Sequence, residues 1–73
     1  FAFAKGEGVS THESKGDALV TALEGEGVIT IDDTVYNIKE GESIVMPARH
    51  PHSVYASKDS GFKMLLVVAF PEA

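Results

Sequence analysis

The chain has 73 residues and no cysteine, which limits it to one domain, residues 1–73, without disulfides or thiolate metal ligands. Eleven acidic residues against six basic ones give a net charge of −5, which argues against nucleic acid or an anionic membrane as a partner. The apolar runs are too short to span a bilayer and no signal-peptide pattern is visible, so we expect a soluble, cytoplasmic protein.

The first half of the chain reads as β-strands with alternating apolar positions. Phe1 and Phe3 alternate with alanine as in the middle of a strand, so we expect further N-terminal residues to precede them in the native chain. Residues 18–24 predict a strand that ends at the glycines of 25–27. Residues 29–38 predict a hairpin with its turn at Asp32 and Asp33, because aspartate tolerates the left-handed backbone of such turns.

The second half predicts three more strands. Residues 43–46 follow a turn at Gly41, and residues 53–56 follow the segment P-A-R-H-P-H, residues 47–52. Residues 62–70 are apolar on both faces apart from one lysine, so we expect this strand to be buried on both sides. No segment has helical periodicity, which indicates a small all-β sandwich or barrel.

Two blocks anchored by glycines carry the functional signal. The first block is Gly6-x5-His12-x-Ser14-x3-Ala18-x6-Gly25, and the second is Gly41-x5-Pro47-x-Arg49-x2-His52-x3-Ala56. Their spacing resembles the two motifs of the cupin superfamily over nearly the whole chain, in the manner of its small single-domain members. The resemblance implies an all-β fold, a double-stranded β-helix (jelly-roll) barrel, with its N-terminal strands missing here.

The resemblance also implies a metal site in the mouth of the barrel. Cupins hold one divalent metal with two histidines and a glutamate of the first motif and a histidine of the second. His12 and His52 keep two of these positions, whereas Ser14 and Ala18 replace the other two. Two imidazoles would hold zinc, nickel or copper weakly, and they suit manganese or iron less well without a carboxylate.

A third ligand would have to come from a neighbouring residue. His50 is our candidate, because it lies two positions before His52 and nominally on the same face, although Pro51 makes its direction uncertain. Glu13 and Asp17 flank the altered positions and would face away from the barrel mouth on a regular strand. Only a bulge near Gly16 would turn Asp17 inward.

Three functions remain open from the sequence. The leading hypothesis is a protein that binds a small polar or sugar-like ligand in the barrel mouth, with a degenerate two-histidine metal site. The first alternative is a metal-dependent cupin enzyme of the dioxygenase or isomerase type, with coordination completed by His50 or water. The second is a structural or interaction module without catalysis.

We also expect the chain to pair with itself as a homodimer. Cupins commonly dimerise through paired or exchanged edge strands. The doubly apolar strand at 62–70 and the opening F-A-F-A are the candidates for such an interface.

Overall fold

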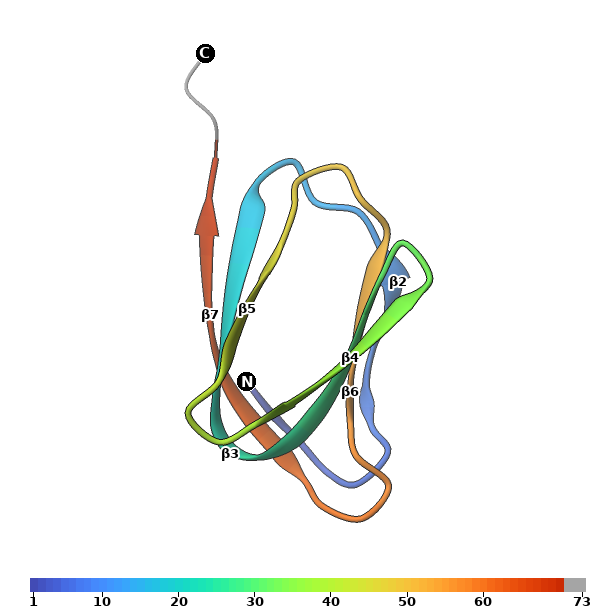
Figure 1. Cartoon of the computed structure of the whole chain (residues 1–73), viewed down its shortest axis with the longest axis vertical. Helices are drawn as coiled ribbons and strands as arrows, with labels where there is room; N and C mark the ends of the chain where they lie inside the picture. Colours follow the sequence, from blue (N-terminus) through green and yellow to red (C-terminus); the bar gives the residue numbers. More distant parts are fainter. Residues whose placement is uncertain (71–73) are drawn as a thin grey trace.

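The computed structural model describes residues 1–70, which form seven β-strands and no helix (Figure 1). The strands are β1 (Ala2–Phe3), β2 (Gly8–His12), β3 (Asp17–Ile31), β4 (Thr34–Lys39), β5 (Ser43–Met46), β6 (His52–Ala56) and β7 (Phe62–Ala69). The prediction of an all-β fold is therefore confirmed. Within this range the chain has no helix of the length and apolar character needed to cross a bilayer.

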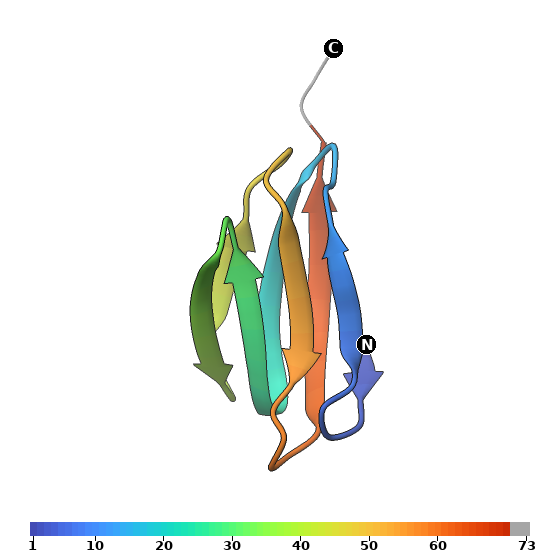
Figure 2. The ribbon, with the colours of Figure 1, turned by 90° about the vertical axis from the view of Figure 1, so that its right-hand side faces the viewer.

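The long strand β3 belongs to two sheets that face each other (Figure 1). Its first part pairs with β5 on one side and β7 on the other, and β1 adds to β7; we call this sheet A. Its second part pairs with β4 and β6, and β2 adds to β6; we call this sheet B. Figure 2 shows β4, β3, β6 and β2 side by side in sheet B. The result is a curled, jelly-roll arrangement with an interior between the two sheets.

The predicted strand end at residues 25–27 is wrong, because β3 continues through them and bends instead. Gly25 has a φ of 79°, a left-handed conformation that glycine adopts at little cost. A Cβ at this position would lie 1.9 Å from the carbonyl oxygen of Gly61, so the close approach of the two chains also requires glycine. An irregularity in the pairing with β7, between Ala22 and Glu24, adds to the bend.

The other predicted turns and strands agree closely with the structure. Asp32 and Asp33 form the β3–β4 turn with φ values of 49° and 70°, so the hairpin is confirmed. The strand at 43–46 is confirmed, and β6 begins one residue earlier than predicted, at His52. The expectation that 62–70 is buried on both sides is wrong for the single chain. Phe62 and Met64 are buried, whereas the side chains that alternate with them are exposed.

The hydrophobic core lies between the sheets. It is built from the inward positions of five strands, namely Ala18, Val20, Ala22, Ile29, Ile38, Met46, Val54, Ala56, Phe62 and Met64. Val20 of sheet A and Ile29 of sheet B are completely buried, and they lie on the two parts of β3. The core therefore fixes how far apart the sheets stand, and it leaves room for a pocket toward the end where β2, β5 and β7 meet the loops.

Candidate ligand and metal site

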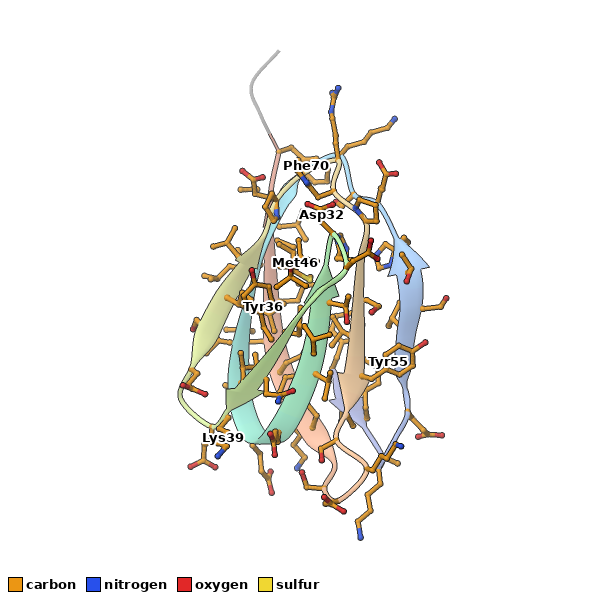
Figure 3. The ribbon with its side chains drawn as sticks, turned by 45° about the vertical axis from the view of Figure 1, so that its right-hand side comes forward. Asp32, Tyr36, Lys39, Met46, Tyr55 and Phe70 are labelled. Carbon is orange, nitrogen blue, oxygen red and sulfur yellow. The ribbon has the colours of Figure 1, made fainter. Side chains whose placement is uncertain are left out.

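A pocket of about 240 Å³ lies between the sheets and is lined by both of them. Most of its wall is aliphatic or thioether side chains from β5, β6 and β7. Its lining residues are Phe1, Val9, His12, Ser14, Ala18, Met46, His52, Val54, Met64, Leu66 and Val68. Figure 3 shows Met46 directed into the interior, whereas Tyr55 lies on the outer side of sheet B. The pocket is therefore apolar, with the two histidines and Ser14 as its polar part.

The structure brings His12 and His52 together from adjacent strands. His12 ends β2 and His52 begins β6, and the two residues are register partners across this antiparallel pair. Their Nε2 atoms lie 3.2 Å apart, and the two rings meet edge to face at an angle of 72°. A register irregularity between Val9 and His12 lets His12 share the interior side with His52.

Backbone carbonyls determine which nitrogen of each ring faces the pocket. The Nδ1 of His12 lies 3.0 Å from the oxygen of Ser10, and the Nδ1 of His52 lies 3.1 Å from the oxygen of His50. A carbonyl oxygen only accepts, so each Nδ1 carries a proton and donates it. In the neutral tautomers both Nε2 atoms are then acceptors. Two lone pairs converge on one point, where they favour a cation or a hydrogen-bond donor.

Burial makes the charged form of His52 unfavourable. Its side chain is only 2% exposed, whereas His12 lies on an exposed edge strand. Burial, followed by repulsion from the neighbouring His12, lowers the pKa of His52 below its usual value, and the hydrogen bond to the His50 carbonyl opposes this shift only in part. His52 is therefore poised as a neutral base and electron-pair donor near neutral pH.

The side chain of His50 contacts a different partner. Its Nδ1 binds Oδ2 of Asp32 at the tip of the β3–β4 hairpin, and both side chains are about half exposed. The backbone supports the same contact, because the amide of Asp32 donates to the oxygen of Pro51. Only the carbonyl of His50 takes part in the histidine pair. Over residues 1–70 no group of three His, Cys, Asp or Glu side chains converges in a way that could hold a metal.

The carboxylate of Asp17 faces the 47–50 turn, as expected for a regular strand. Its Oδ1 accepts a hydrogen bond of 2.7 Å from the amide of Ala48, and the next amide, that of Arg49, donates to the oxygen of Ser14. These two bonds attach the turn to the start of β3. The sequence pattern did not reveal this role, although the positive φ of Arg49, 65°, belongs to the same tight turn.

The pair of histidines fits a metal in two coordination positions. Two bonds of about 2.0–2.1 Å at a tetrahedral angle would separate their nitrogens by roughly 3.3 Å, close to the 3.2 Å found here. The Nδ1–H groups bound to carbonyls are the usual support for histidine ligands. Ser14 lines the same pocket, but its hydroxyl already accepts from the amide of Gly16. The remaining positions would fall to water or to a bound ligand.

The two curled sheets with histidines on the interior side define a small jelly-roll barrel protein. The family model for the cupin domain matches residues 1–68, and the chain belongs to this family. A search of the curated proteins gives no match.

Solved structures give the same assignment. A conserved protein of unknown function from Streptococcus pyogenes is 50% identical, with a TM-score of 0.92 over 99% of this chain and 61% of that one. A cupin superfamily protein from Desulfitobacterium hafniense is 38% identical, with a TM-score of 0.89 over 97% of this chain and 63% of that one. The chain thus spans about three-fifths of the length of these two proteins.

A more distant structure shares the fold alone. Oxalate decarboxylase from Bacillus subtilis, described with Mn(II) centres, is 24% identical, with a TM-score of 0.87 over 94% of this chain and 19% of that one. The resemblance to the cupin superfamily and the barrel fold are therefore confirmed.

Proposed function

We propose that this chain is a small-molecule-binding cupin whose pocket holds its ligand at the His12–His52 pair, with a weakly held divalent transition metal between the two imidazoles. The observation that carries the proposal is the convergence of two Nε2 acceptors 3.2 Å apart at an otherwise apolar pocket. Two acceptors facing each other at this distance repel unless a cation or a donor lies between them. Zinc, nickel and copper are the metals that imidazole ligands suit best.

The walls of the pocket favour a ligand with an apolar body and one polar end, rather than the polar or sugar-like ligand expected from the sequence. A sugar would bury several hydroxyl groups against Val54, Met64 and Leu66, which offer no hydrogen-bond partner. A cavity of about 240 Å³ is also slightly below the usual range for drug-sized ligands. A small aromatic or aliphatic carboxylate satisfies both limits.

The chain's own residues would bind and orient such a ligand. His12 and His52 would hold the metal through Nε2, while the carbonyls of Ser10 and His50 keep the rings in position. A bound metal would act as a Lewis acid and neutralise the carboxylate. The aliphatic wall would exclude water from the apolar body of the ligand.

Calorimetric titration with Zn²⁺ and Ni²⁺ tests the metal part of the proposal. We expect one weak site in the native chain, and its loss in His12→Ala and in His52→Ala. His50→Ala is the matched control, because its ring binds Asp32 and not the pair. Absence of binding in the native chain would refute the metal, and an equal loss in His50→Ala would refute the two-histidine assignment.

The ligand class requires a separate measurement. Nuclear magnetic resonance spectra recorded with benzoate and with glucose, each with and without Zn²⁺, compare an apolar carboxylate with a sugar. We expect benzoate to shift the methyl signals of Val54, Met64 and Leu66, which line the pocket. Shifts with glucose at these methyl groups and none with benzoate would contradict the proposed ligand class.

A further inference from the structure

The outer face of sheet A carries an apolar surface that no other part of residues 1–70 covers. Its members are Leu19, Leu23, Val45, Leu65 and Val67, which are 39% to 53% exposed; we call them the sheet A patch. They form continuous rows across three strands, because Leu19 pairs with Val45 on β5 and with Val67 on β7. Contiguous apolar patches of this kind mark interaction sites more often than scattered exposed residues do.

The outer face of sheet B differs in composition. Its cross-strand pairs include Glu26 with Lys39 and Thr30 with Ser53, as expected for a sheet face in contact with water. The two outer faces belong to the same strand β3, so the contrast is not a property of the whole chain. Sheet A is therefore the face that lacks a partner in the single chain.

The charges around the sheet A patch lie at its two ends. Lys63 forms an ion pair of 3.1 Å with Glu24 at one end, and Asp17 lies at the other end, where it pairs in register with Ala69. The centre of the face is uncharged, because Thr21 and Ser43 bond to each other through their hydroxyl groups at 2.9 Å. A cation and an anion at opposite ends of an apolar face make the face complementary to itself.

The size of the face is sufficient for a modest dimer. Three strands about 4.8 Å apart, each contributing about eight residues of 3.3 Å, project roughly 400 Å². That is nearly a tenth of the 4710 Å² accessible surface of the chain. Two such faces bury on the order of 1,000 Å² once side-chain relief is included, which is near the lower limit of specific interfaces.

We propose that a second copy of this chain covers the sheet A patch, with a two-fold axis that runs across the strands between Leu19 and Thr21. This axis stacks the apolar rows of the two copies and brings Lys63 of each copy near Asp17 of the other. Face-to-face sheets pack at about 10 Å, a distance that leucine and valine side chains fill. The interface involves the solvent side of β7, so it leaves the histidine pocket open.

Sedimentation equilibrium of the native chain between about 1 and 500 µM tests the proposal, since interfaces of this size commonly give micromolar affinity. We expect a dimer that Val67→Lys weakens by ~tenfold or more, because the change buries an unpaired charge. Val35→Lys is the matched control on β4, where valine is 59% exposed outside the patch. Lys63→Glu should weaken the dimer several-fold by placing two acids near each other.

A monomer at every concentration would overturn the proposal, as would a dimer that Val67→Lys leaves unchanged or that Val35→Lys weakens equally. An unchanged affinity in Lys63→Glu would overturn the orientation of the axis. Should Val67→Lys fail to fold by circular dichroism, a crosslinking experiment decides. Because the chain has no cysteine, Thr21→Cys should form a dimer with a short bismaleimide, and Val35→Cys should not. Equal crosslinking of both variants would overturn the interface.

Discussion

The Nε2 atoms of His12 and His52 lie 3.2 Å apart, although 40 positions separate the two residues in the chain. Both rings are fixed from behind by backbone carbonyls, so neither can turn its Nδ1–H toward the other without losing a hydrogen bond. The point between the two nitrogens is therefore open to a single occupant, a proton or a metal ion. This competition links pH, metal binding and stability.

Acidification should reduce the stability of the chain through His52. The pKa of His52 is lowered in the folded protein, chiefly by burial, so the unfolded state binds more protons between the folded pKa and 6.5. The free energy of unfolding should therefore fall as the pH drops from 7.5 through 6.5. Urea unfolding at pH 7.5 and 5.5 measures it, and His52→Gln should have a smaller pH dependence than the native chain. His50→Gln is the control; a reduction of the same size there would contradict the assignment.

Replacing Ala18 with glutamate should strengthen metal binding. Ala18 is buried and lines the pocket with both histidines, at the position where the cupin motif has a glutamate. We expect Ala18→Glu to tighten Ni²⁺ or Mn²⁺ binding by at least about tenfold, or ~1.4 kcal/mol, because it supplies a carboxylate ligand. Without metal the buried acid should lower the melting temperature, and metal should restore it.

Calorimetry and thermal melts with and without metal measure both effects. Val35→Glu, on an exposed position of β4, adds the same charge away from the pocket and should change neither. If Ala18→Glu binds metal no more tightly than the native chain, position 18 does not face the histidine pair.

Two glycines with similar backbone angles should respond differently to alanine. Gly25 and Gly41 have φ values of 79° and 87°, so alanine costs about 1–2 kcal/mol at either position through backbone strain. At Gly41 a Cβ meets nothing within 4 Å, whereas at Gly25 it meets the oxygen of Gly61. We expect Gly25→Ala to cost ~3 kcal/mol or more, since the backbone must also move. Chemical denaturation checks this order, and equal losses would contradict it.

The two aspartates of the hairpin turn should also differ. Asp32 binds His50, whereas Asp33 adopts the same left-handed conformation without a hydrogen bond or ion pair of its side chain among the described residues. Asparagine tolerates this conformation as well as aspartate, so Asp33→Asn should leave stability nearly unchanged. Asp32→Asn should cost ~0.5–1 kcal/mol, the range for an exposed charged pair.

Urea denaturation at pH 6, where His50 is partly protonated, gives the clearest difference between the two variants. Indistinguishable midpoints would mean that the contact between Asp32 and His50 contributes nothing to stability.

Much of the architecture could be predicted from local pattern. The alternation of apolar residues, the aspartates at positions 32 and 33 and the glycine spacing indicated the strands, the hairpin and the cupin barrel. These features depend on the chain's immediate neighbours, so they are visible along the sequence. The continuation of β3 through Gly25 was not predictable, because the glycine serves a bend that only the approach of Gly61 explains.

The sequence by itself determined which residue types are present at the motif positions, including the loss of a carboxylate at Ala18. The tertiary structure decided which of these residues meet. It paired His12 with His52, directed His50 to Asp32 and Asp17 to the amide of Ala48, and surrounded the pair with aliphatic side chains. The physical reason is that strand register and backbone hydrogen bonds set side-chain direction, and both involve residues distant in the chain.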